Sequence, residues 1–306
     1  MRDLNSITSH PTHLPKRTKA ALGHNRNSVP ELPPLLPYLS DRSDQEISLQ
    51  QALNYHKKNR SRRPFICIIH GDEREAHDRF LERLDKISFL KLLGLDPDQI
   101  PIKNYGSLKW PVSPDTPQDR LERLKNEMAT RLVGRSPATP EEMVKVVIQH
   151  RGPVMICTHL RAENWRRHET ELIKRWFHFW NNEWPDVAPG QQLSVFLNIH
   201  YVHTASCSLF EKWRRERLHK RIRNFVTTLD FLRYDELSGV TLPELQPVFQ
   251  KDAEDWAREY RDSIADFRDA LAVLQGIQEL YERTKVRSIP MRELGDNLKK
   301  LLMEIG

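Results

Sequence analysis

The sequence predicts an α/β protein in which a mainly parallel sheet lies between two layers of helices, with a helical portion at the C-terminal end. Three observations predict this class. Apolar runs without polar alternation, at 65–69, 154–157 and 193–199, are typical of strands buried on both faces. Amphipathic stretches separate these runs, as the crossover helices of parallel strands require. Beyond Cys207 the candidate elements are chiefly helical.

Length and composition are consistent with one large α/β domain and appended segments in a chain of 306 residues. No apolar run approaches the roughly 18 residues of a membrane helix, so no membrane partner is expected. Three separated cysteines form no disulfide framework, and residues 1–15 lack the apolar stretch of a secretory signal. A cytoplasmic location is therefore expected. The net charge of +6 only weakly favours an acidic partner.

Along the chain, residues 1–36 predict a flexible, basic, proline-containing tail. Residues 37–285 are expected to form the α/β domain, and 286–306 a C-terminal helix. Ser43 and Glu46 have the spacing of a capping box, which predicts a helix from there to about His56. Further helices are expected at about 72–93, 117–133, 140–150, 163–182, 208–224, 248–262, 266–284 and 290–304, and a less secure strand at 102–105.

The candidate site follows the first buried strand. In a P-loop, such a strand leads into G-x-x-x-x-G-K-[S/T], whose backbone amides cradle phosphate, whose lysine neutralises it and whose hydroxyl holds magnesium. Counted from Gly71, the second glycine is replaced by Ala76, the lysine by His77 and the hydroxyl residue by Asp78. The setting of a P-loop is present, but the residues that perform its chemistry are absent.

Two further features argue against nucleotide chemistry. Asp72, Glu73 and Glu75 put three carboxylates at the start of the helix, where they should satisfy its dipole and repel phosphate. A nucleotide site also needs an acid after a second buried strand to help hold magnesium. Asn198 stands at that place, after the run 193–197. We therefore expect a protein that is not an enzyme, with no catalytic residues, no metal and no cofactor.

The segment from Leu35 to Glu46, followed by a helix, basic residues and the run from Arg63 to Gly71, resembles the inactive STAND family, degenerate relatives of the signal-transducing STAND NTPases. The likeness extends more loosely to Leu242–Leu245 and Asp252–Trp256, and covers roughly 36–285. It implies a P-loop NTPase-like scaffold that does not hydrolyse nucleotide. It also implies a regulatory or adaptor role in bacterial conflict systems that defend against phage, with protein partners from the same operon bound through small adaptor domains.

Two other clusters invite a catalytic or metal-binding interpretation. Residues 70–72 and His77 could form an acid–base or metal group, but nothing supplies a nucleophile, so a structural role is favoured. His200, His203 and Cys207 have a ligand-like spacing, yet zinc requires four ligands or three and a water. Cys67 and Cys157 are more simply small buried hydrophobic residues.

The basic stretch 212–223 offers a surface for an anionic partner. Its candidate residues are Arg214, Arg215, Arg217 and Arg221. On this helix, Phe210, Trp213, Ile222 and Phe225 can pack inward. A second aromatic set, Trp176, Trp180 and Trp184, is expected in the core rather than as a base-stacking platform. Two alternatives stay open: a nucleotide or small-molecule sensor that does not hydrolyse its ligand, and a nucleic-acid-binding protein that uses 212–223 and the basic residues 57–63.

Overall fold

The computed structural model describes residues 32–303, except 60, 97, 99, 113–114, 204–207 and 266–268. The predicted tail thus lies, up to residue 31, outside the described residues. The chain divides into two compact units, residues 42–247 and a second made of 1–41 with 248–306. The domain boundaries expected from the sequence, 37–285 and 286–306, stay predictions.

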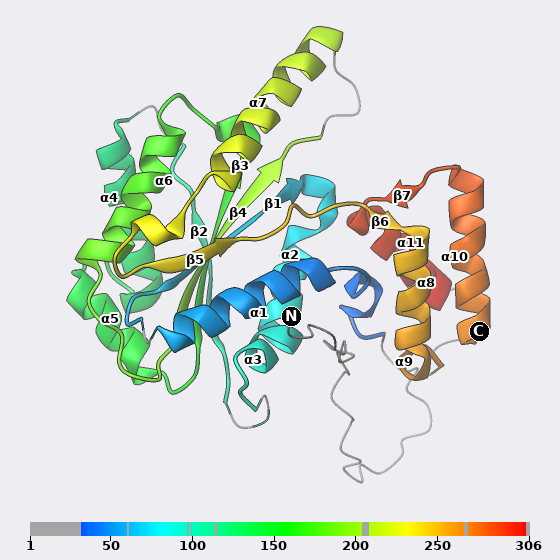
Figure 1. Cartoon of the computed structure of the whole chain (residues 1–306), viewed down its shortest axis with the longest axis horizontal. Helices are drawn as coiled ribbons and strands as arrows, with labels where there is room; N and C mark the ends of the chain where they lie inside the picture. Colours follow the sequence, from blue (N-terminus) through cyan, green and yellow to red (C-terminus); the bar gives the residue numbers. More distant parts are fainter. Residues whose placement is uncertain are drawn as a thin grey trace, which may run out of the picture. The chain divides into compact units, whose positions relative to one another are not determined.

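The larger unit is built on a five-stranded sheet in which every pairing is parallel. Its strands follow the order β2-β3-β4-β1-β5, so β1 lies between β4 and β5 (Figure 1). The strand bounds are β1 Phe65–Asp72, β2 Lys103–Lys109, β3 Val154–Arg161, β4 Leu193–Tyr201 and β5 Ser238–Thr241. The four predicted strands are present, whereas β5 was not expected.

Two hydrophobic clusters on opposite faces of this sheet give it three layers. The smaller cluster joins Cys67, Ile69 and Phe196 to the first group of helices, and the larger joins Ile68, Leu197 and the second group. The first group is α1 Ser43–Lys58, α2 His77–Arg83 and α3 Phe89–Leu92, and the second is α4 Pro117–Val133, α5 Pro140–Gln149, α6 Glu169–His178 and α7 Leu209–Thr227. The arrangement confirms the predicted P-loop NTPase-like three-layer sandwich.

Short irregular turns interrupt the helical layers. Two π-helical segments, Leu84–Ser88 and Phe179–Glu183, continue α2 and α6, so the predicted long helices 72–93 and 163–182 are each divided. Three 3₁₀ turns lie at Glu73–Glu75, Ala162–Asn164 and Phe231–Arg233. None of the helices that the structure describes is long and apolar enough to cross a membrane.

The capping box expected at the start of α1 is wrong. Arg42 is the N-cap residue and no side chain caps the helix. The Glu46 carboxylate instead accepts hydrogen bonds from Arg83 Nε at 2.9 Å and from the Ser88 hydroxyl at 2.5 Å. These groups are buried, and a carboxylate buried beside a guanidinium gains more from that ion pair than from a free backbone amide.

The tryptophan set lies in the core, as predicted. Trp176, Trp180 and Trp184 are all fully buried, and the ring centroids of Trp180 and Trp184 are 4.6 Å apart. Cys67 and Cys157 are buried free thiols inside strands, which confirms their interpretation as small core residues.

A buried ion pair fixes the start of α6 against α4. Arg120 NH1 and NH2 donate to the two carboxylate oxygens of Glu169 at 3.1 and 2.6 Å. The indole N–H of Trp110 donates to the same carboxylate, and Arg120 also donates to the carbonyl oxygen of Pro111. Because Glu169 is fully buried, removing it would leave the Arg120 charge without a counterion in a low-dielectric site.

The substitution Glu169→Ala should therefore lower the free energy of unfolding by about 3–5 kcal/mol. Chemical denaturation followed by tryptophan fluorescence measures this loss. Glu171→Ala on the same helix is the matched control, since Glu171 is exposed and its ion pair within the described ranges is with Arg175. Glu171→Ala should lower the free energy of unfolding by no more than about 0.5 kcal/mol. Equal losses in the two variants would contradict the role given to the buried pair.

The smaller unit is mainly helical, as predicted for the C-terminal portion. Its elements are the 3₁₀ turn Leu36–Tyr38, β6 Val248–Phe249, α8 Gln250–Glu259, α9 Arg261–Ala265, α10 Ala270–Thr284, β7 Ser288–Ile289 and α11 Met291–Met303. The Trp256 indole donates to Leu36 O at 2.9 Å, and the Tyr38 hydroxyl donates to Asp296 at 3.0 Å. Gly295 leaves room for the Tyr38 ring, since a Cβ there would collide with it. Residues from the two ends of the sequence thus share one core.

Candidate functional site

The residues of the candidate site meet at the carboxyl ends of β1, β3 and β4, the edge at which open α/β sheets bind ligands. The turn after β1 lies here, followed by α2. The register places His159 of β3 opposite Asn198 of β4, and Gly71 of β1 opposite His200. Side chains from three strands and one turn therefore converge.

Gly71 lies within β1 rather than in a phosphate-binding loop. It forms an isolated parallel bridge with Leu245. A Cβ at this position would lie 2.8 Å from Leu245 Cβ and 2.9 Å from Leu245 O. The absence of a side chain at Gly71 therefore permits close packing of the segment that follows β5.

Ala76 occupies the backbone conformation that a glycine normally takes. Its φ and ψ are 52° and 49°, in the left-handed region, and α2 begins at the next residue, His77. A non-glycine residue pays a steric cost of roughly 1 kcal/mol there. The turn thus retains a left-handed residue before the helix at the position counted as the second glycine.

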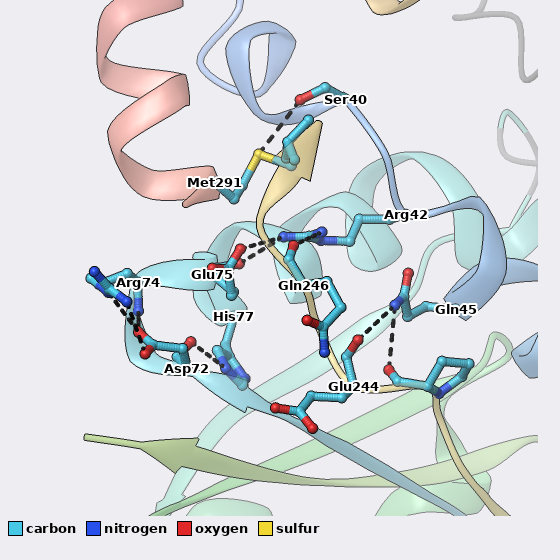
Figure 2. Close-up of polar contacts among 12 residues, drawn as sticks. Ser40, Arg42, Gln45, Asp72, Arg74, Glu75, His77, Glu244, Gln246 and Met291 are labelled. Atoms are coloured by element: carbon cyan, nitrogen blue, oxygen red, sulfur yellow. Dashed lines mark hydrogen bonds and ion pairs between the residues drawn. The ribbon is translucent and has the colours of Figure 1, made fainter. Parts of the chain in front are cut away.

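The ring of His77 is buried beneath this turn. Its Nε2 is 3.1 Å from Asp72 O (Figure 2), and its ring centroid is 4.2 Å from that of His200. Nδ1 is buried and has no hydrogen-bond partner among the described residues. Burial lowers the pKa of His77 to about 3, so the ring is neutral at neutral pH.

Two more histidines extend the stack. His159 Nδ1 lies 2.8 Å from His200 Nε2, and their ring planes are nearly parallel. Burial, followed by the nearby His77, lowers the pKa of His200 to about 2, and burial lowers that of His159. We define His77, His159 and His200 as the histidine stack. It fills the end of the sheet with neutral imidazoles.

Asn198 lies beside this stack on the buried face of β4. It is fully buried, and neither its side-chain oxygen nor its nitrogen has a hydrogen-bond partner in the described part of the chain. Alternation along β4 places it on the same face as Phe196 and His200. An unsatisfied amide in such a place is costly, and a small polar group such as a water would satisfy it.

The three carboxylates of the turn are bound to the protein's own arginines. Asp72 accepts from the Arg74 backbone and side chain, and Figure 2 shows the Arg74 guanidinium folded back on it. Glu75 pairs with buried Arg42 at 3.3 Å. Their charges are therefore largely neutralised, so phosphate would meet an occupied turn rather than the free acidic helix start expected from the sequence.

Glu73 is held in a similar way. It pairs with Arg161 at the end of β3 at 3.1 Å and accepts from His203 N at 2.9 Å. Asp78, counted in the hydroxyl position, is exposed in the first turn of α2. The turn, β3 and the segment after β4 are thus cross-linked by side chains.

The structure brings together no metal site in the residues that it describes. Of the proposed ligand group, His200 belongs to the histidine stack and His203 lies 3.8 Å from Asp72. Cys207 lies outside the described residues.

The basic surface lies on α7, whose N-terminal half extends beyond the sheet (Figure 1). Arg214, Arg217 and Arg221 are exposed and Arg215 is partly buried. The inward packing expected of Phe210 and Trp213 is wrong for both, as they are 68% and 54% exposed, and right for buried Ile222 and half-buried Phe225. Only the C-terminal half of α7 has the sheet beneath it.

The histidine stack makes the stability of the larger unit depend on pH. Because the folded-state pKa values of His77 and His200 lie below the ordinary 6.5, the unfolded chain binds more protons once the pH falls below 6.5. The contribution of these two histidines to the free energy of unfolding is therefore fully present above pH 6.5 and is lost as the pH falls below it. His200→Gln should reduce the loss between pH 7 and pH 5 by up to about 2 kcal/mol.

Urea unfolding of the wild type and the variant at the two pH values tests this. His178→Gln, which replaces an exposed histidine of α6, should lose as much stability as the wild type. Identical pH dependence in the wild type and His200→Gln would contradict the burial of a neutral stack.

Residues 37–199 match the inactive STAND family. No curated protein matches the chain. Solved structures with a similar chain path include a RuvB mutant of Thermotoga maritima, with 11% identity, a TM-score of 0.31 and coverage of 86% of this chain and 70% of that one.

Two more are a Walker-type ATPase of Pyrococcus abyssi and the ORC2 protein of Aeropyrum pernix with ADPNP and ADP. The first has 11% identity and a TM-score of 0.41, and covers 86% of this chain and 68% of that one. The second has 8% identity and a TM-score of 0.38, with coverage of 90% and 70%. Because the family match spans more than half of the sequence, this chain belongs to the inactive STAND family.

Proposed function

We propose that the protein is a non-catalytic regulatory or adaptor component of a bacterial conflict system directed against phage, and that it acts in the cytoplasm through protein–protein interaction. The observation that carries the non-catalytic part is the buried, neutral ring of His77 at the position counted for the P-loop lysine. A lysine there supplies a positive charge to phosphate, whereas a buried imidazole with a pKa of about 3 supplies none.

The surrounding groups support the same proposal. Asn198 offers an amide where magnesium binding needs a carboxylate, so this position supplies no negative charge to hold the ion. The carboxylates of the turn are paired with arginines, and the left-handed residue is Ala76. Family membership adds the expectation of partners, which would be products of the same operon bound through small adaptor domains.

Isothermal titration with ATP or GTP and magnesium should give no binding in the micromolar range and no turnover. The physical reason is that the position counted for the P-loop lysine holds a neutral imidazole, and the arginines at the turn are already paired with its carboxylates. Turnover that is lost on substitution of His77 or Asn198 would contradict the proposal. Tight binding without turnover would instead favour a nucleotide sensor that does not hydrolyse its ligand.

The adaptor role has its own test. Co-expression with the products of the adjacent genes should give a complex that stays together in size-exclusion chromatography. A repeated failure of every such pair to associate would count against an adaptor role, whatever the nucleotide experiments give.

A second candidate function, nucleic-acid binding, is favoured by one observation on α7. Six cations in its stretch 212–221 make no ion pair with a described residue, namely Lys212, Arg214, Arg215, Arg217, Lys220 and Arg221. Exposed Trp213, with the Arg217 guanidinium 4.6 Å from its ring centroid, could stack on a base.

If α7 binds nucleic acid, a gel shift with single-stranded or duplex DNA should weaken steeply as salt rises. Replacing Arg214, Arg215, Arg217 and Arg221 together by Glu should abolish the shift. A shift that persists in this variant, or no shift at low salt, would remove this second function.

A further inference from the structure

A groove of about 1290 Å³ runs along the outer side of β5 in the larger unit. Its floor is the strand itself, Ser238–Thr241, which forms one edge of the sheet (Figure 1). One end reaches Arg62 and Asp186, near the start of β1, and the other reaches His70 and Glu244, near its end. The groove therefore follows the edge of the sheet along the whole strand.

Backbone groups of β5 face this groove. Leu242 N donates to Ile68 O at 2.9 Å. This bond identifies which residues in and after β5 direct their backbone N–H and C=O toward β1. In a parallel ladder, alternate residues direct their N–H and C=O to opposite sides. The N–H and C=O of Val240 therefore point toward β1, whereas the N–H and C=O of Gly239 and Thr241 point away from β1 and into the groove. No strand of the described part of the chain pairs with that side. These outward groups are available to an added strand.

The walls of the groove carry apolar and aromatic side chains on both sides of this row. One wall comes from α1 and includes Ala52 and Tyr55, and the other comes from 229–237 and includes Phe231 and Tyr234. Leu232, on the second wall, is 77% exposed. Because the side chains of a strand alternate between its two faces, those of an added strand would reach both walls.

The lining of the groove is acidic. Five carboxylates line it, against two guanidinium groups. The carboxylates are Asp186, Asp230, Asp235, Glu236 and Glu244. Four of the five carboxylates are paired with arginines: Asp186 with Arg62 and Arg63, Glu236 with Arg63, Asp230 with Arg233 and Glu244 with Arg223. Asp235 is exposed and has no ion pair with a described residue. The exposed Asp235 carboxylate therefore offers a point of attraction for a cationic side chain of the added segment.

We propose that this groove binds an extended, lysine- or arginine-rich segment of a protein partner, which adds to the sheet as a strand beside β5. Backbone hydrogen bonds to Gly239 and Thr241 hold the segment, and Asp235 selects its charge. The proposal rests on the function above, because it names where and how a protein partner is bound.

The probe is a synthetic peptide of about nine residues in which valine and lysine alternate, a length typical of a strand. Fluorescence anisotropy should detect its binding to the full chain, and a valine–glutamate peptide should not bind. N-methylation of the residues whose N–H faces β5 should abolish binding, whereas N-methylation of the intervening residues should leave it unchanged. Equal effects of the two methylated peptides would overturn the added strand.

Hydrogen exchange gives an independent readout. On binding the valine–lysine peptide, the amides of Gly239 and Thr241 should exchange more slowly, because they gain hydrogen-bond acceptors. Val240, already bonded to β1, should change little by comparison. Binding that leaves Gly239 and Thr241 unchanged would contradict the proposal.

Asp235→Lys should weaken peptide binding by on the order of tenfold, through reversal of a charge at the groove. The matched control is Asp98→Lys, the same change at an exposed residue that does not line the groove. Circular dichroism checks that both variants fold. Equal weakening of peptide binding by both variants would mean that only the overall charge of the protein attracts the peptide, and would overturn the proposed site.

The operon partner separates this proposal from the one on which it rests. If a stable complex forms but is unaffected by Asp235→Lys and by excess peptide, the groove proposal fails and the adaptor function stands. If no product of an adjacent gene binds, the adaptor function fails, whatever the peptide does.

Discussion

The architecture of the larger unit depends on the burial of β1 on both faces and on both edges. Its first seven residues are buried, β4 pairs with one edge and β5 with the other. Such a strand has no solvent-facing side, so its side chains are apolar until the last residues, where the sheet ends. The polar groups of the chain can collect only beyond that point, and the candidate site is located there.

At this edge, the turn between β1 and α2 contains one left-handed residue and is surrounded by neutral or ion-paired side chains. Ala76 keeps a left-handed backbone and α2 begins directly after it. The interior is occupied by neutral rings and by carboxylates bound to arginines. Exposed charge is present elsewhere in the unit, as cations on α7. The modest net charge of the whole chain thus conceals a basic surface.

The sequence predicted those features whose cause is local. Apolar runs marked the three buried strands β1, β3 and β4, and helix periodicity marked the layers on either side. β5 was missed because Ser-Gly-Val-Thr contains one apolar residue, as suits an edge strand that is only half buried. The capping box failed because Glu46 found a buried guanidinium in a distant helix, and no local pattern reports such a partner.

The site was predicted only in part, for the same reason. Their places in and after the first and third buried strands put Gly71, His77 and Asn198 at the carboxyl edge of the sheet, and the structure has all three there. The histidine stack was not foreseen, because His77, His159 and His200 are far apart in sequence and only the strand register brings the last two together. The outward rings of Phe210 and Trp213 were also missed, since periodicity cannot show where the sheet beneath a helix ends.

The order of the two units in the sequence has a consequence for biosynthesis. The smaller unit is discontinuous: the turn Leu36–Tyr38 bonds to Trp256 and Asp296, more than 200 residues later, and the larger unit is inserted between these parts. On the ribosome, the larger unit can fold as soon as residue 247 has emerged. The contacts that join Leu36–Tyr38 to Trp256 and Asp296 can form only after residue 296 has been made. This core is therefore completed only after the whole inserted unit has been synthesised.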